Sequence, residues 1–502
     1  MDRLRRSVQD RPFAAVFVIV VLVTLLRAIV LALTPLNLGP DEAQYWSWSL
    51  KPDFGYYSKP PMIAWIIGAS TAACGDAEVC VRITAPFLHA ASTLFVYLAA
   101  RRFYDLQTGF WSAITYLLIP GTSFSSLLIT TDVPLICFWS LGVWALAELR
   151  LQRTVRWSTV LGAAIGLGLL SKYAMLYFLL GVGLACLPSQ DGRRLLFDRN
   201  MLVTLAVALL VFSPNIVWNL THDLETVRHT ASNANWNANT LFNVGHVFEF
   251  IIAQAGIIGP IAAGLLVWGL VRAWPDRKWG HPDTLMLTLS LPVIAIVAAQ
   301  AFISRANANW AAPAFVTLCI LVCAWAVRHR KESVLLANSV VNASIALLMG
   351  ALAVSPAFVE ASGQENSVKR LRGWSEEGRT IITIASSAPF TAILSDDRED
   401  MASLYYYTRT RQVPLRMWPS DHPGNEYEAS YALSADVSSL VLFVTRSNDV
   451  SAITNAFASS ERIGSIETRL DSKRKRVFHL FALKGPVTAS TFPNFFNRPS
   501  TE

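Results

Sequence analysis

Long apolar runs separated by short polar loops dominate the first 356 residues of the chain. Runs of about 18 or more apolar residues are typical of membrane-spanning helices. The pattern predicts about eleven spans, near residues 13–35, 83–101, 106–121, 133–150, 157–171, 173–188, 201–218, 246–272, 284–303, 310–328 and 334–356. The first run is too long for a cleaved signal peptide and lacks a small-residue cleavage site, so a retained anchor is expected.

The pattern changes after residue 357. Short β-rich runs (TIITIASS, TAILS, SSLVLFVT and RVFHLFAL) alternate with polar helical stretches, DREDMASLYYYTR and SAITNAFASS. We therefore expect two domains, a helical membrane domain over 1–356 and a small α/β domain over 357–502. Asp396, Asp397 and Arg398 could form a site, but acids after a strand more often cap a helix. A structural or acceptor-docking role is expected for this domain.

Composition agrees with a polytopic membrane protein. Of the 502 residues, 53% are hydrophobic and only 15% are charged, whereas soluble domains carry about 25% charged residues. The net charge of +7 does not indicate nucleic acid, because the basic residues gather in short loops after every second span. These residues are Arg3, Arg5, Arg6, Arg101, Arg102, Arg150, Arg153, Arg156, Arg193, Arg194, Arg199, Arg272, Arg277, Lys278, Arg328, Arg330 and Lys331.

Charge placement also predicts the orientation. Cytoplasmic loops are enriched in Lys and Arg, so the N-terminus is expected in the cytoplasm. The periplasmic segments would then be 36–82, 121–132, 171–173, 219–245, 303–310 and the domain from 357 to 502.

The first outer loop, 37–82, has an unusual composition for a connector. It begins NLGPDEAQYWSWSLKPDFGYYSKPPMIAW, with adjacent acids Asp41 and Glu42. Acids could accept a proton or hold a metal ion, the aromatic rings of Tyr45, Trp46 and Tyr57 could hold a sugar, and Lys59 could hold a phosphate. The alternative is an aromatic belt at the membrane edge with solvated charges. Pro60-Pro61 would start an interfacial helix over 61–74.

The motif DEAQYW…GYYSKPP resembles the first periplasmic loop of the GT-C glycosyltransferases. It is most similar to the subgroup of dolichyl-phosphate-mannose protein mannosyltransferases and lipid A aminoarabinose transferases, and above all to rhizobial-type lipopolysaccharide galacturonosyltransferases. The resemblance covers about residues 10–330. It implies a GT-C fold with juxtamembrane helices in the first loop, and a sugar transfer that inverts the anomeric centre.

Two further residues match family patterns in part. Asp132 begins a span, where the helix dipole alone favours an acid, and the resemblance implies that it faces the first-loop acid. Lys172 lies at membrane depth between two spans, where a charge is costly unless it has a partner or a cavity. The alternative is that Lys172 snorkels to the headgroups. Its surroundings resemble the family's L-x-K-G motif, with Tyr173 in place of the glycine.

Two other outer loops carry polar candidates. Arg305 could hold a phosphate through two parallel hydrogen bonds, and sugar contacts are expected from His222, Asn307, Asn309 and Trp310. Either loop could instead be a solvated surface.

The six cysteines give one candidate cross-link. Cys74 and Cys80 lie in the first outer loop, where the compartment is oxidising, so they could form a disulfide or remain two thiols. Cys137, Cys186, Cys319 and Cys323 lie in apolar runs and are expected to be packing residues.

Several enzyme classes are excluded by motif. The chain has no P-loop, no Rossmann glycine motif after a strand and no nucleophile elbow. Because the candidate residues gather on the outer face, where nucleotide sugars are not available, the donor that fits is a polyprenyl-phosphate sugar in the membrane.

We therefore predict an inner-membrane glycosyltransferase that moves a sugar from an undecaprenyl-type phosphate to lipid A or lipopolysaccharide core. Asp41 is the candidate base or acceptor-orienting group, and Glu42 and Asp132 would position the acceptor or a divalent ion, with Asp41 and Asp132 as the possible metal ligands. Lys59, Lys172 and Arg305 would stabilise the leaving phosphate. The alternatives are a protein O-mannosyltransferase acting on Ser or Thr, and a non-enzymatic flippase of lipid-linked sugars.

The orientation can be tested with reporter fusions. Fusions after residues 102, 195 and 330 should report cytoplasm, and fusions after 125 and 360 should report periplasm, because the basic loops stay inside. A cytoplasmic C-terminal tail would place the first loop on the wrong side for a lipid-linked donor.

Overall fold

The computed structural model describes residues 12–485 except 233–241, 274–280, 435–438 and 472. The expected basic residues Arg3, Arg5, Arg6, Arg277 and Lys278 lie outside these ranges. The chain forms two compact units. The first takes 1–33, 53–55 and 59–351, and the second takes 34–52, 56–58 and 352–502. The first outer loop is thus divided between the two units.

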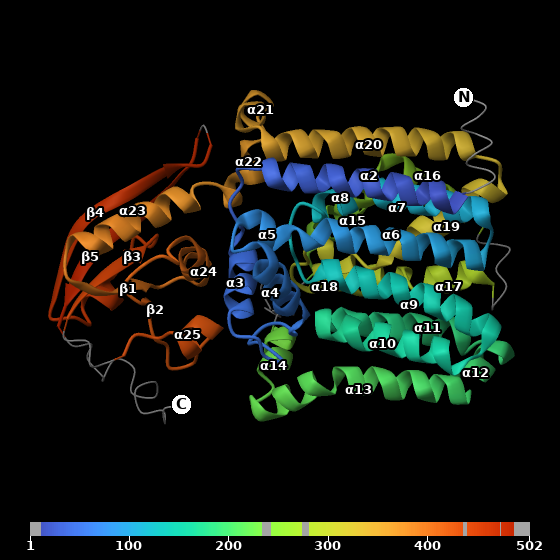
Figure 1. Cartoon of the computed structure of the whole chain (residues 1–502), viewed down its shortest axis with the longest axis horizontal. Coiled ribbons are helices and arrows are strands. Elements are labelled where there is room, and N and C mark those ends of the chain that lie inside the picture. Colours follow the sequence, from blue (N-terminus) through green and yellow to red (C-terminus); the bar gives the residue numbers. More distant parts are fainter. Residues whose placement is uncertain (1–11, 233–241, 274–280, 435–438, 472, 486–502) are drawn as a thin grey trace. The chain divides into compact units, whose positions relative to one another are not determined.

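The first unit is helical, and its long helices run roughly side by side (Figure 1). α9 lies at its centre, in contact with both α6 and α10, and buries Trp139 against Phe178. The helices are α2 (Pro12–Leu33), α4 (Met62–Cys74), α5 (Glu78–Arg82), α6 (Thr84–Phe103), α7 (Leu106–Leu118), α8 (Pro120–Ser125), α9 (Asp132–Gln152), α10 (Val155–Ser171), η1 (Tyr173–Met175), α11 (Leu176–Cys186), α12 (Gln190–Leu196), α13 (Arg199–Thr221), α14 (Glu225–Ser232), α15 (Val244–Ile258), α16 (Pro260–Ala273), α17 (Pro282–Thr288), α18 (Leu291–Ile303), η4 (Ala308–Ala311), α19 (Ala314–Arg328) and α20 (Glu332–Val354).

Six helices in the described part of the chain are long and apolar enough to cross a membrane, or seven if a bent pair counts as one span. The sequence predicted about eleven spans, and three of them, near 157–171, 173–188 and 310–328, appear as apolar helices of 10–17 residues. Large apolar side chains on α2 and α13, among them Leu22 and Leu210, are exposed. Such exposure is typical of helices that face lipid rather than water.

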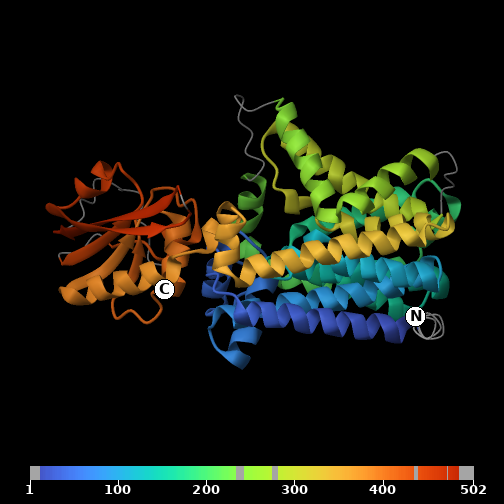
Figure 2. The same ribbon diagram turned by 90° about the horizontal axis from the view of Figure 1, so that it is seen from above.

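One predicted span is broken. The sequence predicted a continuous helix over 246–272, whereas the structure has α15 and α16 bent by 109° (Figure 2). Gly259 between them has φ +90, a conformation that favours glycine, and Pro260 has no N–H to continue the helical hydrogen bonds. The prediction of one uninterrupted helix is therefore wrong.

The second unit combines α3 (Pro40–Ser49) with a five-stranded sheet of order β2-β1-β3-β5-β4. β1 pairs in parallel with β2 and β3, and β5 pairs antiparallel with β3 and β4. The remaining elements are α21 (Pro356–Ala361), α22 (Glu365–Val368), η5 (Lys369–Leu371), α23 (Trp374–Ser387), β1 (Phe390–Ser395), α24 (Arg398–Tyr407), β2 (Leu415–Met417), α25 (Glu426–Ser430), β3 (Leu440–Thr445), α26 (Ser451–Thr454), β4 (Ser459–Arg469) and β5 (Lys475–Lys484).

An α/β fold is confirmed for this region, with two errors in its elements. The predicted strand TIITIASS belongs to helix α23, where Glu377, Ile381 and Ala385 are buried at helical spacing. The stretch SAITNAFASS is helical only over α26, and its end enters β4. β4 was missed because most of its residues are polar and exposed, as at the edge of a sheet.

The predicted helix over 61–74 is present as α4, and Cys74 at its end is joined to Cys80 of α5 by a disulfide. This confirms the cross-link. The other four cysteines are buried as free thiols, which agrees with a packing role.

The bend between α15 and α16 can be tested with two glycine substitutions. Gly259→Ala should destabilise the protein by about 1–3 kcal/mol, because a Cβ there would lie 2.3 Å from Asn342 Oδ1. Gly256→Ala is the matched control, since a Cβ at Gly256 meets nothing within 4 Å. Thermal unfolding of the purified variants measures both. Equal stability of the two would show that the bend does not depend on Gly259.

Candidate active site

The two adjacent acids of the first loop have different surroundings. Pro40 occupies the first turn of α3, and the Glu42 side chain caps the start of this helix, where its Oε2 accepts from the N–H of Gly39 at 2.8 Å. The Glu42 side chain is buried, whereas the Asp41 side chain is 66% exposed. Asp41 is therefore the acid that an outside reactant could reach.

Arg398 contacts Asp41 within the second unit. Its Nη1 donates to Asp41 Oδ1 at 3.2 Å and to Gln44 Oε1 at 2.5 Å. Burial lowers the pKa of Arg398, but the charges of Asp41 and Glu399 outweigh burial and raise it overall. Asp397 caps α24 by accepting from the N–H groups of Glu399 and Asp400, which confirms the predicted cap. The guanidinium is thus held where it can orient the Asp41 carboxylate.

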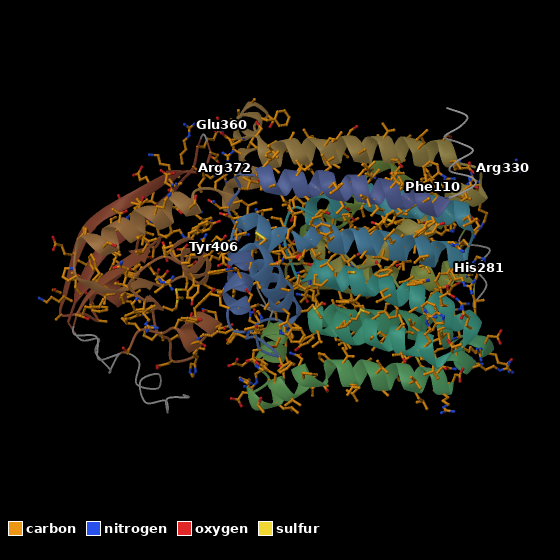
Figure 3. All side chains as sticks on the ribbon, viewed as in Figure 1. Phe110, His281, Arg330, Glu360, Arg372 and Tyr406 are labelled. Atoms are coloured by element: carbon orange, nitrogen blue, oxygen red, sulfur yellow. A yellow bond between two sulfur atoms is a disulfide. The ribbon has the colours of Figure 1, made fainter. Side chains whose placement is uncertain are left out.

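Aromatic packing anchors α3 to α24. Trp46 is 3% exposed and meets Tyr406 edge-on at 4.8 Å between ring centroids, and Figure 3 labels Tyr406. The Leu38 N–H donates to the Tyr407 hydroxyl at 2.6 Å. Tyr45 is also buried and packs on Trp48. Burial gives Tyr45 and Trp46 a packing role and leaves little surface for a sugar.

Tyr57 also belongs to the second unit. Its hydroxyl donates to the carbonyl of Pro423 at 2.8 Å. The Tyr57 ring is half-buried, so this predicted sugar contact retains an accessible surface.

In the first unit, three predicted residues from separate loops meet. Asp132 begins α9, Lys172 lies in the extended break between α10 and η1, and Asn309 lies in η4. Lys172 Nζ lies 2.7 Å from Asp132 Oδ1, and Asn309 Nδ2 donates to Asp132 Oδ2 at 2.7 Å. The Asp132 side chain is 6% exposed and that of Lys172 is 21% exposed. Each charge thereby has a partner, as apolar surroundings require.

The other candidates of the first unit lie at its loops. Lys59 is half-buried ahead of α4, while Arg305 is exposed and makes no ion pair with a described residue. His222 ends α13 and stacks on Trp218 at 4.1 Å. Asn307 is exposed and Trp310 is half-buried. Arg305 is thus available to an anionic ligand.

A polar network that the sequence did not reveal holds residues 53–55. Trp218 Nε1 donates to Asp53 Oδ2 at 2.9 Å, and Asn215 Nδ2 donates to the carbonyl of Phe54 at 2.7 Å. Tyr173 completes it by donating to Asn215 Oδ1 at 2.9 Å. The one sequence feature that pointed to this network was Tyr173, which follows Lys172 where the family motif has glycine. Tyr173 thus links the segment after Lys172 to this part of the first loop.

The described residues contain no group of three or more His, Cys, Asp or Glu side chains that could hold a metal ion. Asp41 and Asp132 belong to different units. A divalent ion at these acids stays a prediction.

Comparison with known proteins identifies the class first. The structure resembles that of ArnT from Cupriavidus metallidurans bound to undecaprenyl phosphate, with a TM-score of 0.68 at 15% identity over 95% of this chain and 99% of that one. Residues 58–218 match the family described as dolichyl-phosphate-mannose-protein mannosyltransferase. This is the GT-C fold of membrane glycosyltransferases.

Sequence similarity narrows the family. The chain is 34% identical over 426 residues to the lipid A galacturonosyltransferase RgtD of Rhizobium johnstonii, which covers 84% of this chain and 89% of that protein. It is 27% identical over 186 residues to the lipopolysaccharide core galacturonosyltransferase RgtA of the same organism, over 37% of each chain. The chain therefore belongs to the GT-C family of membrane glycosyltransferases, in the group that includes RgtD. It is a glycosyltransferase embedded in a membrane.

The Asp132–Lys172 pair can be tested with a double-mutant cycle. Asp132→Asn and Lys172→Gln should each destabilise the protein by about 1–3 kcal/mol, because each leaves a mostly buried charge without its partner. The double variant should regain most of that stability. Thermal unfolding measures the coupling. Additive losses would show that the two side chains do not compensate each other.

Proposed function

We propose that this glycosyltransferase moves one sugar from an undecaprenyl-type phosphate carrier to lipid A on the periplasmic face of a bacterial inner membrane. The observation that carries the proposal is the 34% identity to RgtD across most of both chains. The structural likeness to ArnT, solved with undecaprenyl phosphate, supports the carrier. Because RgtD and RgtA are both named as galacturonosyltransferases, galacturonic acid is the first sugar to test.

The proposed reaction is an inverting displacement at the anomeric carbon. A hydroxyl oxygen of the acceptor forms the new glycosidic bond and gives its proton to the Asp41 carboxylate. The bond between the anomeric carbon and the phosphate oxygen breaks, and its electron pair leaves with the phosphate. General-base help of this kind contributes about a hundred- to ten-thousand-fold in rate.

Exposure and contacts support Asp41 as the base. Its carboxylate is open to solvent, and Arg398 holds it from one side. Glu42 supports the same helix from within, through its capping contact. Asp41 would therefore accept the proton, and Glu42 would stabilise the start of the helix.

The leaving phosphate would be stabilised by cations of the first unit. Arg305 is exposed, and its planar group can donate two parallel hydrogen bonds. Lys59 would add a second charge. Lys172 is paired with Asp132. We assign Lys172 to the phosphate as well, which would replace Asp132 as its partner, while Asp132 and Asn309 set the position of its side chain.

Two alternatives remain within the same family or fold. The match of residues 58–218 to the protein mannosyltransferase family favours a Ser or Thr acceptor as the second candidate. Lipopolysaccharide core is the third acceptor, on the shorter similarity to RgtA. Transfer assays with purified protein, a polyprenyl-phosphate sugar and each acceptor distinguish them, and a flippase would transfer to none.

The role of Asp41 can be tested by Asp41→Asn. The amide keeps the shape and the contact with Arg398 but cannot accept the proton, so transfer should fall about a hundredfold or more. Expression, thermal unfolding and binding of the donor lipid should stay close to wild type, because Asp41 is exposed.

Glu42→Gln is the matched control for this substitution. Gln at the same position can also close a capping box, so this variant should keep its fold and most of its activity. An active Asp41→Asn protein together with an inactive Glu42→Gln protein would exchange the two roles.

A further inference from the structure

The second unit contains a cavity of about 530 Å³ with a basic lining. Its walls include Lys369, Arg370, Arg446, Lys475, Arg476 and His479. Pro40 also lines the cavity, and Glu399 is the single acidic residue of the lining. The volume lies in the range of sites that hold small molecules, about 300–1,000 Å³, and far exceeds that of one inorganic ion.

Two basic runs of the sequence meet at this cavity. Lys369–Arg372 reads KRLR and passes through η5, while Lys473–Arg476 reads KRKR and leads into β5. Arg476 joins them, because its Nη2 donates to the carbonyl of Arg372, which Figure 3 labels. Its Nε donates to the buried Glu377 at 2.8 Å, and its guanidinium lies over the Trp374 ring at 3.7 Å. The wall is therefore firmly positioned.

The positive charge of the lining is only partly compensated. Lys369 makes no ion pair with a described residue, and Arg372 Nη2 is buried without an acceptor among the residues described. The pairs of Arg370 with Glu399 and of Lys475 with Glu467 lie at the surface. Such exposed pairs contribute little, so a ligand with several anionic oxygens can replace their carboxylates.

Arg446 pairs with Asp397, which caps α24, and with Asp400 in the first turn of that helix. Burial raises the pKa of Asp400 to about 7 despite the Arg446 charge. Asp397 and Asp400 both pair with Arg446, so the uncompensated positive charge of the lining is carried by Lys369. The cavity thus keeps an excess of positive charge.

The cavity adjoins the candidate base. Pro40, which lines it, immediately precedes Asp41 in α3. Glu399, which also lines it, follows Arg398, whose guanidinium contacts Asp41 at 3.2 Å. All of these residues belong to the same compact unit. A ligand in the cavity would therefore lie next to the residues that flank and hold Asp41.

We propose that this cavity binds the anionic head group of the acceptor lipid, a carbohydrate that carries phosphate or carboxylate groups. Lys369 and Lys475 would contact its anionic oxygens, and the cavity would thereby select the acceptor. This inference rests on the proposed function. A smaller free anion would leave most of the volume unfilled, which is why we assign the site to the head group.

The test uses full-length protein and the double variant Lys369→Gln/Lys475→Gln. Calorimetric titration with deacylated lipid A should show at least about tenfold weaker binding, since one charge-assisted contact of about 1.4 kcal/mol corresponds to tenfold. Lys484→Gln is the matched control, because Lys484 ends the same strand outside the cavity and should bind like wild type. In transfer assays the variant should raise KM for lipid A and leave kcat and the KM for the donor unchanged.

Each result decides the proposal. Equal binding by wild type and the double variant, or no binding by wild type, would overturn it. Displacement of deacylated lipid A by an equal concentration of inorganic phosphate would also overturn it, because the site would then prefer a free anion. If wild-type protein binds deacylated lipid A but transfers no sugar to intact lipid A, the proposed function is refuted. The proposal for the cavity is then decided by whether the double variant binds deacylated lipid A more weakly than wild type.

Discussion

The attachment of α3 to α24 is the contact on which the candidate site depends. A ten-residue helix with polar and aromatic residues on all sides cannot be stable alone in water. It persists because Trp46 packs edge-on against Tyr406, and because Tyr407 accepts the N–H of Leu38. Arg398 at the start of α24 then contacts Asp41. The α3 part of the first loop and the C-terminal α/β elements therefore form one structural unit.

A second constraint applies in the helical unit. A charge in apolar surroundings must have a partner or a cavity. Asp132 satisfies this requirement by contacting both Lys172 and Asn309. The same pairing limits what these groups can do. Lys172 can serve a phosphate only by leaving Asp132, whereas Arg305 carries no such obligation among the described residues. Arg305 could therefore bind a phosphate directly, whereas Lys172 would first have to exchange Asp132 for the phosphate.

The basic cavity gives the second unit a chemical role besides support. The same polypeptide segment, from Pro40 to Gln44, borders the cavity and contacts Arg398. Binding of an anion at Arg370 would compete with Glu399, which lies next to Arg398 in sequence. Glu399 at the cavity and Arg398 at Asp41 are thus adjacent residues in the first turn of α24.

The sequence by itself determined the class of the protein, its apolar helices, the candidate acids and the cap at Asp397, because these depend on composition and local spacing. It also indicated the disulfide, since Cys74 and Cys80 are close along the chain. Tertiary structure decided the helical state of TIITIASS and the strand β4, where packing partners distant in sequence choose between local conformations. It also decided which adjacent acid is exposed: Asp41 and Glu42 are chemically alike, and only the capping geometry of α3 and its contact with Arg398 separate them.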